Sequence, residues 1–395
     1  MNSPSTAAAP HGLRLNPHVA ALPPYNAGMN VEVARAISGH QDIARLASNE
    51  NPEGCSPLVM QALASTAYEP WRYADPACTA LRAALAHKLG CQAQHIVVGN
   101  GSEEMIAAIA RALLLPGDRV LTVVPSFGLH EIEPLAAGAS VTKVAMNAQL
   151  DFDLDGLERA LADAPKVAFL SSPWNPVGPA LGHAALQRLI KAVRPGTLLV
   201  LDEAYFEFAD PGTPNGVELL RRSAAAHVVL RTFSKAYGLA GLRVGYAVCS
   251  HPEIARVLTA AKTPFNVNAA AQAAALAALA DEAWMQASVQ RLRRERERVA
   301  SALQALGLRV ATSHTNFLFF DVEQNSAGVA DRLLRQHGVI VKAWGEQGYE
   351  HFVRATIGSP PENDRLIAAL TQMRCAQTGA AAAPRPDAAK SHDAR

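Results

Sequence analysis

The sequence predicts an α/β protein with two domains: a large domain whose mostly parallel sheet is wrapped by helices, and a smaller α+β domain. The first observation is an alternation of apolar, strand-like runs with amphipathic helical patterns, which is typical of parallel sheets joined by helices. The second is size, because 395 residues with 49% hydrophobic residues can bury one large core and a smaller one.

The alternation is clearest in the first part of the chain. In order, we expect a helix over residues 78–89, a strand over 95–98, a helix over 103–114 and a strand over 119–124. Further on, the runs at 167–170 and 199–201 are apolar throughout, so they predict strands that are buried on both faces.

The smaller domain is predicted from the later part of the chain. Residues 282–306 have arginine-rich faces, with Leu303 and Leu306 in the last turns, and predict one long helix leaving the large domain. Residues 316–322 predict a strand beyond it. We expect this division: 1–14, flexible tail; 15–50, segment packing with the small domain; 51–285, large domain; 286–376, small domain; 377–395, disordered tail.

Composition narrows the partners to small molecules. The net charge is +1 and no polybasic segment occurs, so neither nucleic acid nor a membrane surface is expected as a partner. The Ala-rich run at 269–280 is too short to span a bilayer. The five cysteines, an odd number, show no metal-binding spacing, and no secretion signal precedes them, so we expect reduced thiols, no metal and a cytoplasmic location.

The most informative motif surrounds Lys235. Ser234 precedes this lysine and Arg243 follows eight positions on, with small residues between them. A lysine in such a setting can lose its proton and form a Schiff base with a carbonyl cofactor, while the hydroxyl and the guanidinium hold that cofactor's phosphate. Pyridoxal 5′-phosphate (PLP) has both of these chemical groups.

Two further motifs follow predicted buried strands, where ligands of α/β sheets bind. Asp202 ends the run at 199–201, and its carboxylate can pair with the pyridine nitrogen of PLP and make the ring an electron sink. Asn175 lies between two prolines after the run at 167–170, and its amide could reach the ring oxygen. Taken singly, a helix cap at Asp202 and a plain turn at Asn175 explain these residues equally well.

A third turn predicts an anion site. Gly101, Ser102 and Glu103 follow the strand at 95–98 and open a helix, so their backbone N–H groups point toward whatever occupies the helix N-terminus. A phosphate group fits that position.

With these motifs the chain resembles the fold-type I PLP-dependent aminotransferases, from about Leu15 to about Leu370, and within them the histidinol-phosphate aminotransferase branch. The segments that carry the resemblance also include 22–25, 46–52, 72–73, 264–268 and 353–358. The resemblance implies a fold-type I large domain with PLP bound through Lys235.

The family's site residues carry over as follows. The expected phosphate ligands are Gly101, Ser102, Glu103, Thr232, Ser234 and Arg243. Phe127 is expected to stack on the cofactor ring, and His130 to orient Asp202. Tyr205 and Asn175 are expected to contact the ring oxygen. Lys235, Asp202 and Tyr205 are the expected catalytic residues. Tyr25, Asn49, Lys342 and Arg354 are the expected substrate-binding residues.

The resemblance also implies a homodimer in which Tyr73 reaches the phosphate in the partner's site. The expected reaction moves the amino group of histidinol phosphate to 2-oxoglutarate, as part of histidine biosynthesis. In this reaction the freed Lys235 amine shifts a proton from the substrate Cα to the cofactor, and Arg354 binds the anionic end of each substrate with its planar guanidinium.

Two departures from the family keep other substrates open. Residue 342 is lysine where the family usually has arginine, and lysine binds phosphate without bidentate geometry. Phe265 stands where some relatives have a tyrosine that contacts the substrate. The alternatives are an aromatic amino-acid aminotransferase, a PLP-dependent decarboxylase of a phosphorylated amino acid and a PLP-binding protein without turnover. The last usually carries an added domain, for which we expect no room here.

Overall fold

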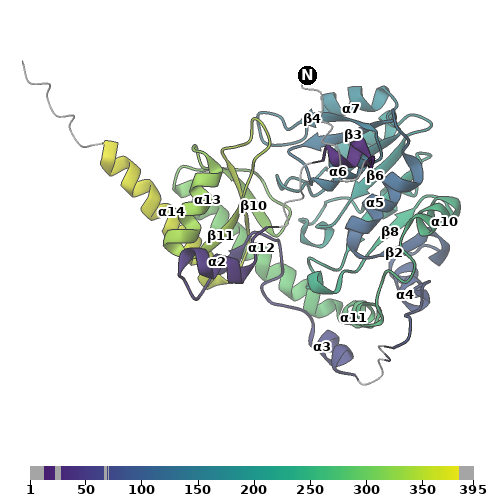
Figure 1. The fold of residues 1–395 in the computed structure, drawn as a ribbon, viewed down its shortest axis with the longest axis horizontal. Coiled ribbons are helices and arrows are strands. Elements are labelled where there is room, and N and C mark those ends of the chain that lie inside the picture. Colours follow the sequence, from purple (N-terminus) through teal and green to yellow (C-terminus); the bar gives the residue numbers. More distant parts are fainter. Residues whose placement is uncertain (1–12, 23–27, 66–68, 70, 382–395) are drawn as a thin grey trace, which may run out of the picture.

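The computed structural model describes residues 13–22, 28–65, 69 and 71–381. Tyr25, most of the expected N-terminal tail and residues 382–395 lie outside the described residues. Figure 1 shows two bodies joined by the long helix α12 (Glu282–Ala305), with the larger one built on a seven-stranded sheet.

The large sheet is mostly parallel, as the sequence predicts. Its strands, in spatial order, are β2 (Ile96–Gly99), β8 (Gly245–Cys249), β7 (His227–Thr232), β6 (Leu198–Asp202), β5 (Val167–Ser171), β3 (Arg119–Val124) and β4 (Ser140–Ala145). Only β8 runs against its neighbours. The fold class is therefore confirmed as α/β.

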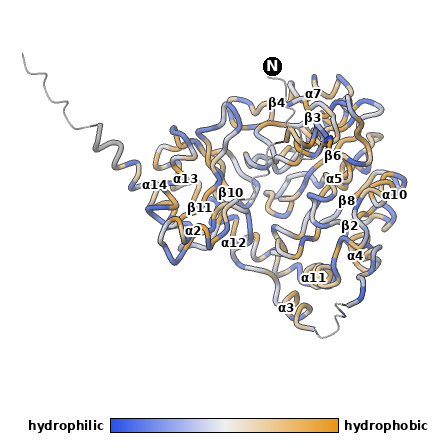
Figure 2. The backbone as a smooth tube through the Cα atoms, in the orientation of Figure 1, coloured by the Kyte–Doolittle hydropathy of each residue, from blue (hydrophilic) through white to orange (hydrophobic). Residues whose placement is uncertain are grey.

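Both faces of this sheet are covered, which explains its continuous apolar runs. On β5, Val167 and Phe169 belong to one buried cluster, whereas Ala168 and Leu170 belong to the other. Successive side chains of a strand point to opposite faces, so a strand buried on both sides has no polar alternation. The central strands are accordingly coloured mostly hydrophobic in Figure 2.

Helices surround the sheet on both sides. They are α3 (Pro57–Ala64), α4 (Thr79–Leu89), α5 (Gly101–Leu113), α6 (Leu129–Ala136), α7 (Leu154–Ala162), α8 (His183–Ala192), α9 (Gly216–Leu220), α10 (Pro252–Ala261) and α11 (Ala269–Ala280), with the short α1 (Pro17–Ala20) against α6. The predicted helices over 78–89 and 103–114 correspond to α4 and α5, and the strands over 95–98 and 119–124 correspond to β2 and β3.

The smaller body is an α+β unit. Its sheet has the order β1 (Ala44–Leu46), β11 (Val339–Ala343), β12 (Phe352–Thr356), β10 (Phe317–Asp321) and β9 (Arg309–Val310), and only the β1–β11 pair is parallel. Helices α2 (Val31–Ser38), α13 (Ser326–His337) and α14 (Pro360–Ala381) pack around it. A segment from near the N-terminus thus contributes an edge strand to a sheet made otherwise of C-terminal residues.

Two of the expected domain boundaries fall inside helices. The expected boundary between residues 285 and 286 falls inside α12, which begins where the Asp281 carboxylate accepts a hydrogen bond from the backbone N–H of Trp284. The helix α14 extends past residue 377, where we expect the C-terminal tail to begin. We retain the division into domains as a proposal.

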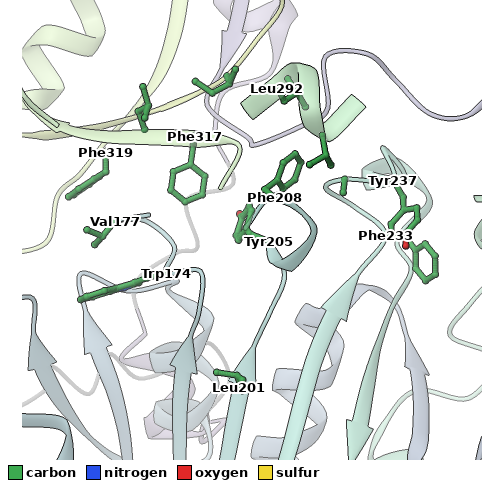
Figure 3. Packing of buried hydrophobic residues seen from close by; sticks show 14 of the residues in the cluster. Trp174, Val177, Leu201, Tyr205, Phe208, Phe233, Tyr237, Leu292, Phe317 and Phe319 are labelled. Carbon is green, nitrogen blue, oxygen red and sulfur yellow. The ribbon is translucent and has the colours of Figure 1, made fainter. Parts of the chain in front are cut away.

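The two domains share an apolar contact above the large sheet. Figure 3 shows Phe317 of β10 facing Tyr205 and Phe208, which follow β6. The Phe317 and Tyr205 rings meet edge to face at 5.2 Å between centroids. This contact places the small domain over the carboxyl ends of the parallel strands.

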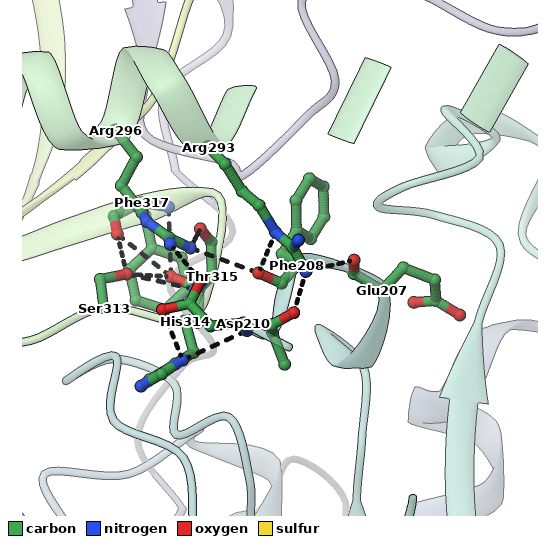
Figure 4. A network of polar contacts seen from close by, with 10 residues as sticks. Glu207, Phe208, Asp210, Arg293, Arg296, Ser313, His314, Thr315 and Phe317 are labelled. Atoms are coloured by element: carbon green, nitrogen blue, oxygen red, sulfur yellow. Dashed lines mark hydrogen bonds and ion pairs between the residues drawn. The ribbon is translucent and has the colours of Figure 1, made fainter. Parts of the chain in front are cut away.

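A polar network fixes the same junction. Arg296 of α12 is buried and donates hydrogen bonds to the Thr315 carbonyl at 3.0 Å and to the Asp210 carboxylate at 2.8 Å (Figure 4). One guanidinium thus bridges the loop after β6 and the segment leading into β10.

Among the described residues, none of the helices combines the length and the apolar character that a membrane span requires. Within the same ranges, no group of His, Cys, Asp and Glu side chains has the arrangement of a metal site.

Candidate active site

The carboxyl ends of β2, β5, β6 and β7 border a cleft of about 940 Å³ between the domains. These strands run in the same direction, so residues far apart in the sequence meet at one edge of the sheet. The predicted site residues that line the cleft are Asn49, Gly101, Ser102, Glu103, Phe127, Asn175, Asp202, Tyr205, Thr232, Ser234, Lys235, Arg243, Lys342 and Arg354.

One end of the cleft is suited to an anion. Helix α5 begins at Gly101, one residue after β2, and the side chain of its N-cap residue, Asn100, makes no capping hydrogen bond. The free N–H groups of a helix N-terminus attract negative charge. Gly101 has a positive φ of 79°, a conformation that glycine adopts without strain.

A second glycine lets this turn approach the sheet. A Cβ atom built on Gly245 of β8 would lie 2.5 Å from the Ser102 nitrogen and 2.7 Å from the Gly101 carbonyl carbon. These are backbone atoms that cannot move aside, so only glycine allows the turn to sit there.

Hydroxyl and guanidinium donors complete the anion site. The Thr232 hydroxyl donates to Ser234 Oγ at 2.9 Å, and both side chains line the cleft. Arg243 also lines it and donates to the Glu103 carboxylate at 2.7 Å and to the Ala240 carbonyl at 3.1 Å. The donor set fits a phosphate group, with Glu103 orienting the arginine.

Both carboxylate oxygens of Asp202 contact other residues of the protein. Its Oδ2 lies 3.1 Å from His130 Nε2, and its Oδ1 accepts a hydrogen bond from the backbone N–H of Ala204 at 3.1 Å. His130 is fully buried and stacks on Phe169 with ring centroids 5.0 Å apart. The histidine itself does not line the cleft, so its contact with the site passes through the Asp202 carboxylate.

Lys235 lines the cleft as well. Its Nζ donates to the Ser48 carbonyl at 3.2 Å. Burial, with a contribution from the positive charge of Arg354, lowers the pKa of the Lys235 ammonium to about 8. Roughly a fifth of this amine is therefore neutral near physiological pH, far more than for an ordinary lysine, and a nucleophile or a base must be neutral.

Asn175 and Tyr205 are each oriented by other side chains. Arg354 donates through Nη1 to Asn175 Oδ1 at 2.7 Å, and Asn49 donates through Nδ2 to the Tyr205 hydroxyl oxygen at 2.9 Å. We expect Asn49 to bind substrate, and in the structure its side chain is also engaged with Tyr205 and Thr356.

The second cation lies beside Arg354. Lys342 of β11 and Arg354 of β12 are direct partners in the antiparallel ladder, and both line the cleft. Burial, with the repulsion from Arg354, lowers the pKa of the Lys342 ammonium. Two positive charges thus border the cleft from neighbouring strands.

Besides His130, one described residue of the predicted set, Tyr73, does not line this cleft. Tyr73 is 84% exposed and stacks on Phe265 with ring centroids 4.4 Å apart. Tyr25 lies outside the described residues. Phe127 does line the cleft, and its ring meets His130 edge to face at 5.6 Å.

Sequence reasoning missed the loop after β11. Trp344 and Glu346 line the cleft, and the Glu346 carboxylate accepts hydrogen bonds from the Trp344 indole at 2.6 Å and from the Ser126 N–H at 3.1 Å. No local motif marks a loop that reaches another domain. Thr356 was missed too, although it lies two residues after Arg354 and thus on the same face of β12.

Comparisons with known proteins place the chain among aminotransferases. The model of the family described as aminotransferase class I and II matches residues 41–370. The chain is 45% identical over 352 residues to "Histidinol-phosphate aminotransferase 1" of Mesorhizobium japonicum, and this match covers 89% of the chain and 95% of the relative.

Solved structures are similar over most of the chain. The histidinol-phosphate aminotransferase from Sinorhizobium meliloti, in complex with pyridoxal 5′-phosphate, superposes with a TM-score of 0.84 at 29% identity, covering 92% of this chain and 98% of that one. The L-threonine-O-3-phosphate decarboxylase from Porphyromonas gingivalis has a TM-score of 0.73 at 25% identity, covering 83% and 98%.

Proposed function

Since this chain belongs to the class I and II aminotransferase family, we propose that it is a PLP-dependent enzyme of histidine biosynthesis. The proposed reaction passes the amino group of histidinol phosphate to 2-oxoglutarate, which yields imidazole acetol phosphate and glutamate. The observation that carries the proposal is the placement of Lys342 and Arg354 on paired strands, lining the same cleft as the Lys235 amine.

The cleft has the groups that PLP needs. The first turn of α5, Thr232, Ser234 and Arg243 would hold the phosphate; Asp202 would pair with the ring nitrogen; Asn175 and Tyr205 would bond the ring oxygen; and Phe127 would stack on the ring. When bound, PLP supplies an electron-withdrawing ring that stabilises negative charge at the substrate Cα.

Lys235 would hold the cofactor covalently and, when released from it, would act as the base. With a pKa near 8, its released amine can take the Cα proton of the substrate and later return it. His130 and the backbone N–H of Ala204 hold the Asp202 carboxylate in position, so this side chain would not have to move during the reaction.

The two cations would bind both substrates in turn. Histidinol phosphate carries about two negative charges at neutral pH, and a pair of cations opposes them better than one. Glutamate and 2-oxoglutarate present carboxylates, which the Arg354 guanidinium binds in bidentate geometry. One site thereby accepts two anion types.

Two alternatives keep the cofactor and change the substrate or the reaction. In the first alternative, Arg354 alone would bind the carboxylate of an aromatic amino acid, and Lys342 would not contribute to substrate binding. Decarboxylation of a phosphorylated amino acid is the second alternative, since the decarboxylase from Porphyromonas gingivalis has a similar fold over most of both chains.

We further propose a homodimer in which Tyr73 is contributed in trans. Support comes from the stacked Tyr73 and Phe265, whose exposed rings line none of this chain's own cleft. A cytoplasmic location is proposed from the cysteine pattern.

The deciding experiment assays the purified enzyme with histidinol phosphate and with phenylalanine, each against 2-oxoglutarate. We expect a kcat/KM at least about tenfold higher for histidinol phosphate, because the second cation would contribute 1.4 kcal/mol or more. A preference for phenylalanine would favour the aromatic alternative. Histidinol phosphate has no carboxyl group to lose, so the decarboxylase alternative is tested with an O-phosphorylated amino acid as a third substrate. Release of CO₂ from it without formation of glutamate would establish the decarboxylase.

A further inference from the structure

We propose that Thr356 is a positioning residue that, through Asn49, directs the Tyr205 hydroxyl toward the ring oxygen of the cofactor. The inference rests on the proposed function, since it concerns the state of bound PLP. Thr356 does not line the cleft, so any effect it has on the cofactor must pass through other side chains.

The three side chains form a continuous buried chain of hydrogen bonds. The Thr356 hydroxyl donates to Asn49 Oδ1 at 3.0 Å, and Asn49 Nδ2 donates to the Tyr205 hydroxyl oxygen at 2.9 Å. Asn49, Tyr205 and Thr356 are 1%, 3% and 3% exposed. Water therefore has little access to replace a lost bond.

The direction of each bond follows from the one before it. The backbone N–H of Asn49 donates to Thr356 Oγ1 at 2.9 Å, and the threonine proton goes to Asn49 Oδ1. This fixes which end of the Asn49 amide faces Tyr205: the NH₂ end. Because the tyrosine oxygen accepts from that NH₂ group, its own O–H must be donated to a different acceptor.

Backbone conformation makes residue 49 suited to this role. Asn49 has a positive φ of 56°, a region that asparagine tolerates better than most residues. Asn316 Nδ2 also donates to the Asn49 carbonyl at 3.0 Å. The amide is therefore held at its backbone N–H, its backbone carbonyl and its side chain.

Strand β12 supports both expected partners of the ring oxygen. Arg354 and Thr356 lie two residues apart and so share a face, with Arg354 bonded to Asn175 and Thr356 linked to Tyr205. The position of one small-domain strand thereby sets two donors in the large domain. Arg354 also faces substrate, whereas Thr356 acts on the cofactor side alone.

The observable is the pH titration of the visible absorbance of bound PLP. Hydrogen bonds to the ring oxygen stabilise its negative form and lower the pKa of the nitrogen that joins Lys235 to the cofactor. Thr356→Val keeps the side-chain shape and removes the hydroxyl, so the titration midpoint should rise by about 0.5–1 pH unit. Thr356→Ser keeps the hydroxyl and should titrate like the wild type.

A double-variant cycle separates positioning from general damage. Tyr205→Phe should raise the midpoint at least as much as Thr356→Val, and the combined variant should shift no further than Tyr205→Phe alone. Asn49→Gly, which suits the positive φ, should reproduce the valine shift if Thr356→Val does not fold.

The outcomes are distinguishable from failure of the proposed function. A wild-type protein that gains no visible absorbance with PLP refutes the cofactor proposal itself. If PLP binds but Thr356→Val, or Asn49→Gly in its place, titrates like the wild type, the positioning role is overturned. Shifts of Thr356→Val and Tyr205→Phe that add in full would also overturn it, because Thr356 would then act independently of Tyr205.

Discussion

Lys342 and Arg354 occupy directly opposed positions on β11 and β12, and both line the cleft. Opposed residues of an antiparallel pair place their Cβ atoms about 4.5–5.5 Å apart on one face of the sheet. Burial lowers the pKa of the Lys342 ammonium, and the repulsion between these like charges lowers it further. A bound anion would offset this repulsion, so the pair of cations favours anion binding.

Lys342→Ala should therefore discriminate between substrates. We expect KM for histidinol phosphate to rise about ten- to a hundredfold, because a partly desolvated charge contact is worth roughly 1.5–3 kcal/mol. KM for phenylalanine should change much less. Steady-state kinetics with both donors measures this, and Lys342→Arg serves as the control that keeps the charge. An unaltered KM for histidinol phosphate would contradict the assignment of Lys342.

Asp202→Asn should bind PLP but turn over more slowly by several orders of magnitude. An amide has no negative charge to keep the ring nitrogen protonated, so the electron sink is lost. Cofactor absorbance measures binding and single-turnover kinetics measures the rate. His130→Phe, which removes a contact but leaves the carboxylate, should cost less. Wild-type turnover in Asp202→Asn would exclude the electron-sink role.

Attachment of PLP to the apoenzyme should depend on pH with a midpoint near 8. Only the neutral Lys235 amine can attack the cofactor, and burial beside Arg354 lowers its pKa to about 8. The rate of appearance of visible absorbance should rise by about tenfold per pH unit below the midpoint and level off above it.

A free lysine derivative gives the matched comparison, since its amine pKa of about 10.4 keeps its rate rising across the same range. Arg354→Ala should move the enzyme's midpoint upward, because a neighbouring positive charge is removed. A plateau reached only near the pKa of free lysine would contradict the depressed pKa of Lys235.

The sequence could predict the elements whose signals are local. Asp202, Asn175 and Lys235 each follow an apolar run, and parallel strands bring such ends together whatever the helices between them do. The opposition of Lys342 and Arg354 depends on strand register, and the link from Thr356 to Tyr205 depends on how two domains dock. Neither leaves a pattern within one segment.

Gly245→Ala should weaken PLP binding without unfolding the chain. A methyl group there would collide with backbone atoms of Gly101 and Ser102 and push the anion-binding turn outward. Overpacking of this kind costs about 1–3 kcal/mol, equivalent to roughly five- to a hundredfold in affinity. Fluorescence titration with PLP measures the loss.

Gly241→Ala is the matched control, because a Cβ atom there meets nothing within 4 Å. It should bind PLP like the wild type. Equal affinity in both alanine variants would show that the turn tolerates the displacement and would remove the close approach from the account of the site.

The last prediction tests whether Tyr73 acts across a dimer interface. If it does, a mixed dimer of a Lys235→Ala chain and a Tyr73→Phe chain has one site with both defects and one site with neither. Activity per mixed dimer should then exceed half that of a Tyr73→Phe homodimer, which is the activity of one Tyr73→Phe site, because the intact site combines Lys235 of one chain with Tyr73 of the other. Differently tagged chains, purified through both tags, provide dimers of known composition. If Tyr73 served its own chain's site, the site that keeps Lys235 would still lack the tyrosine hydroxyl. Activity no higher than one Tyr73→Phe site supplies, in dimers verified to contain both chains, would refute the contribution in trans.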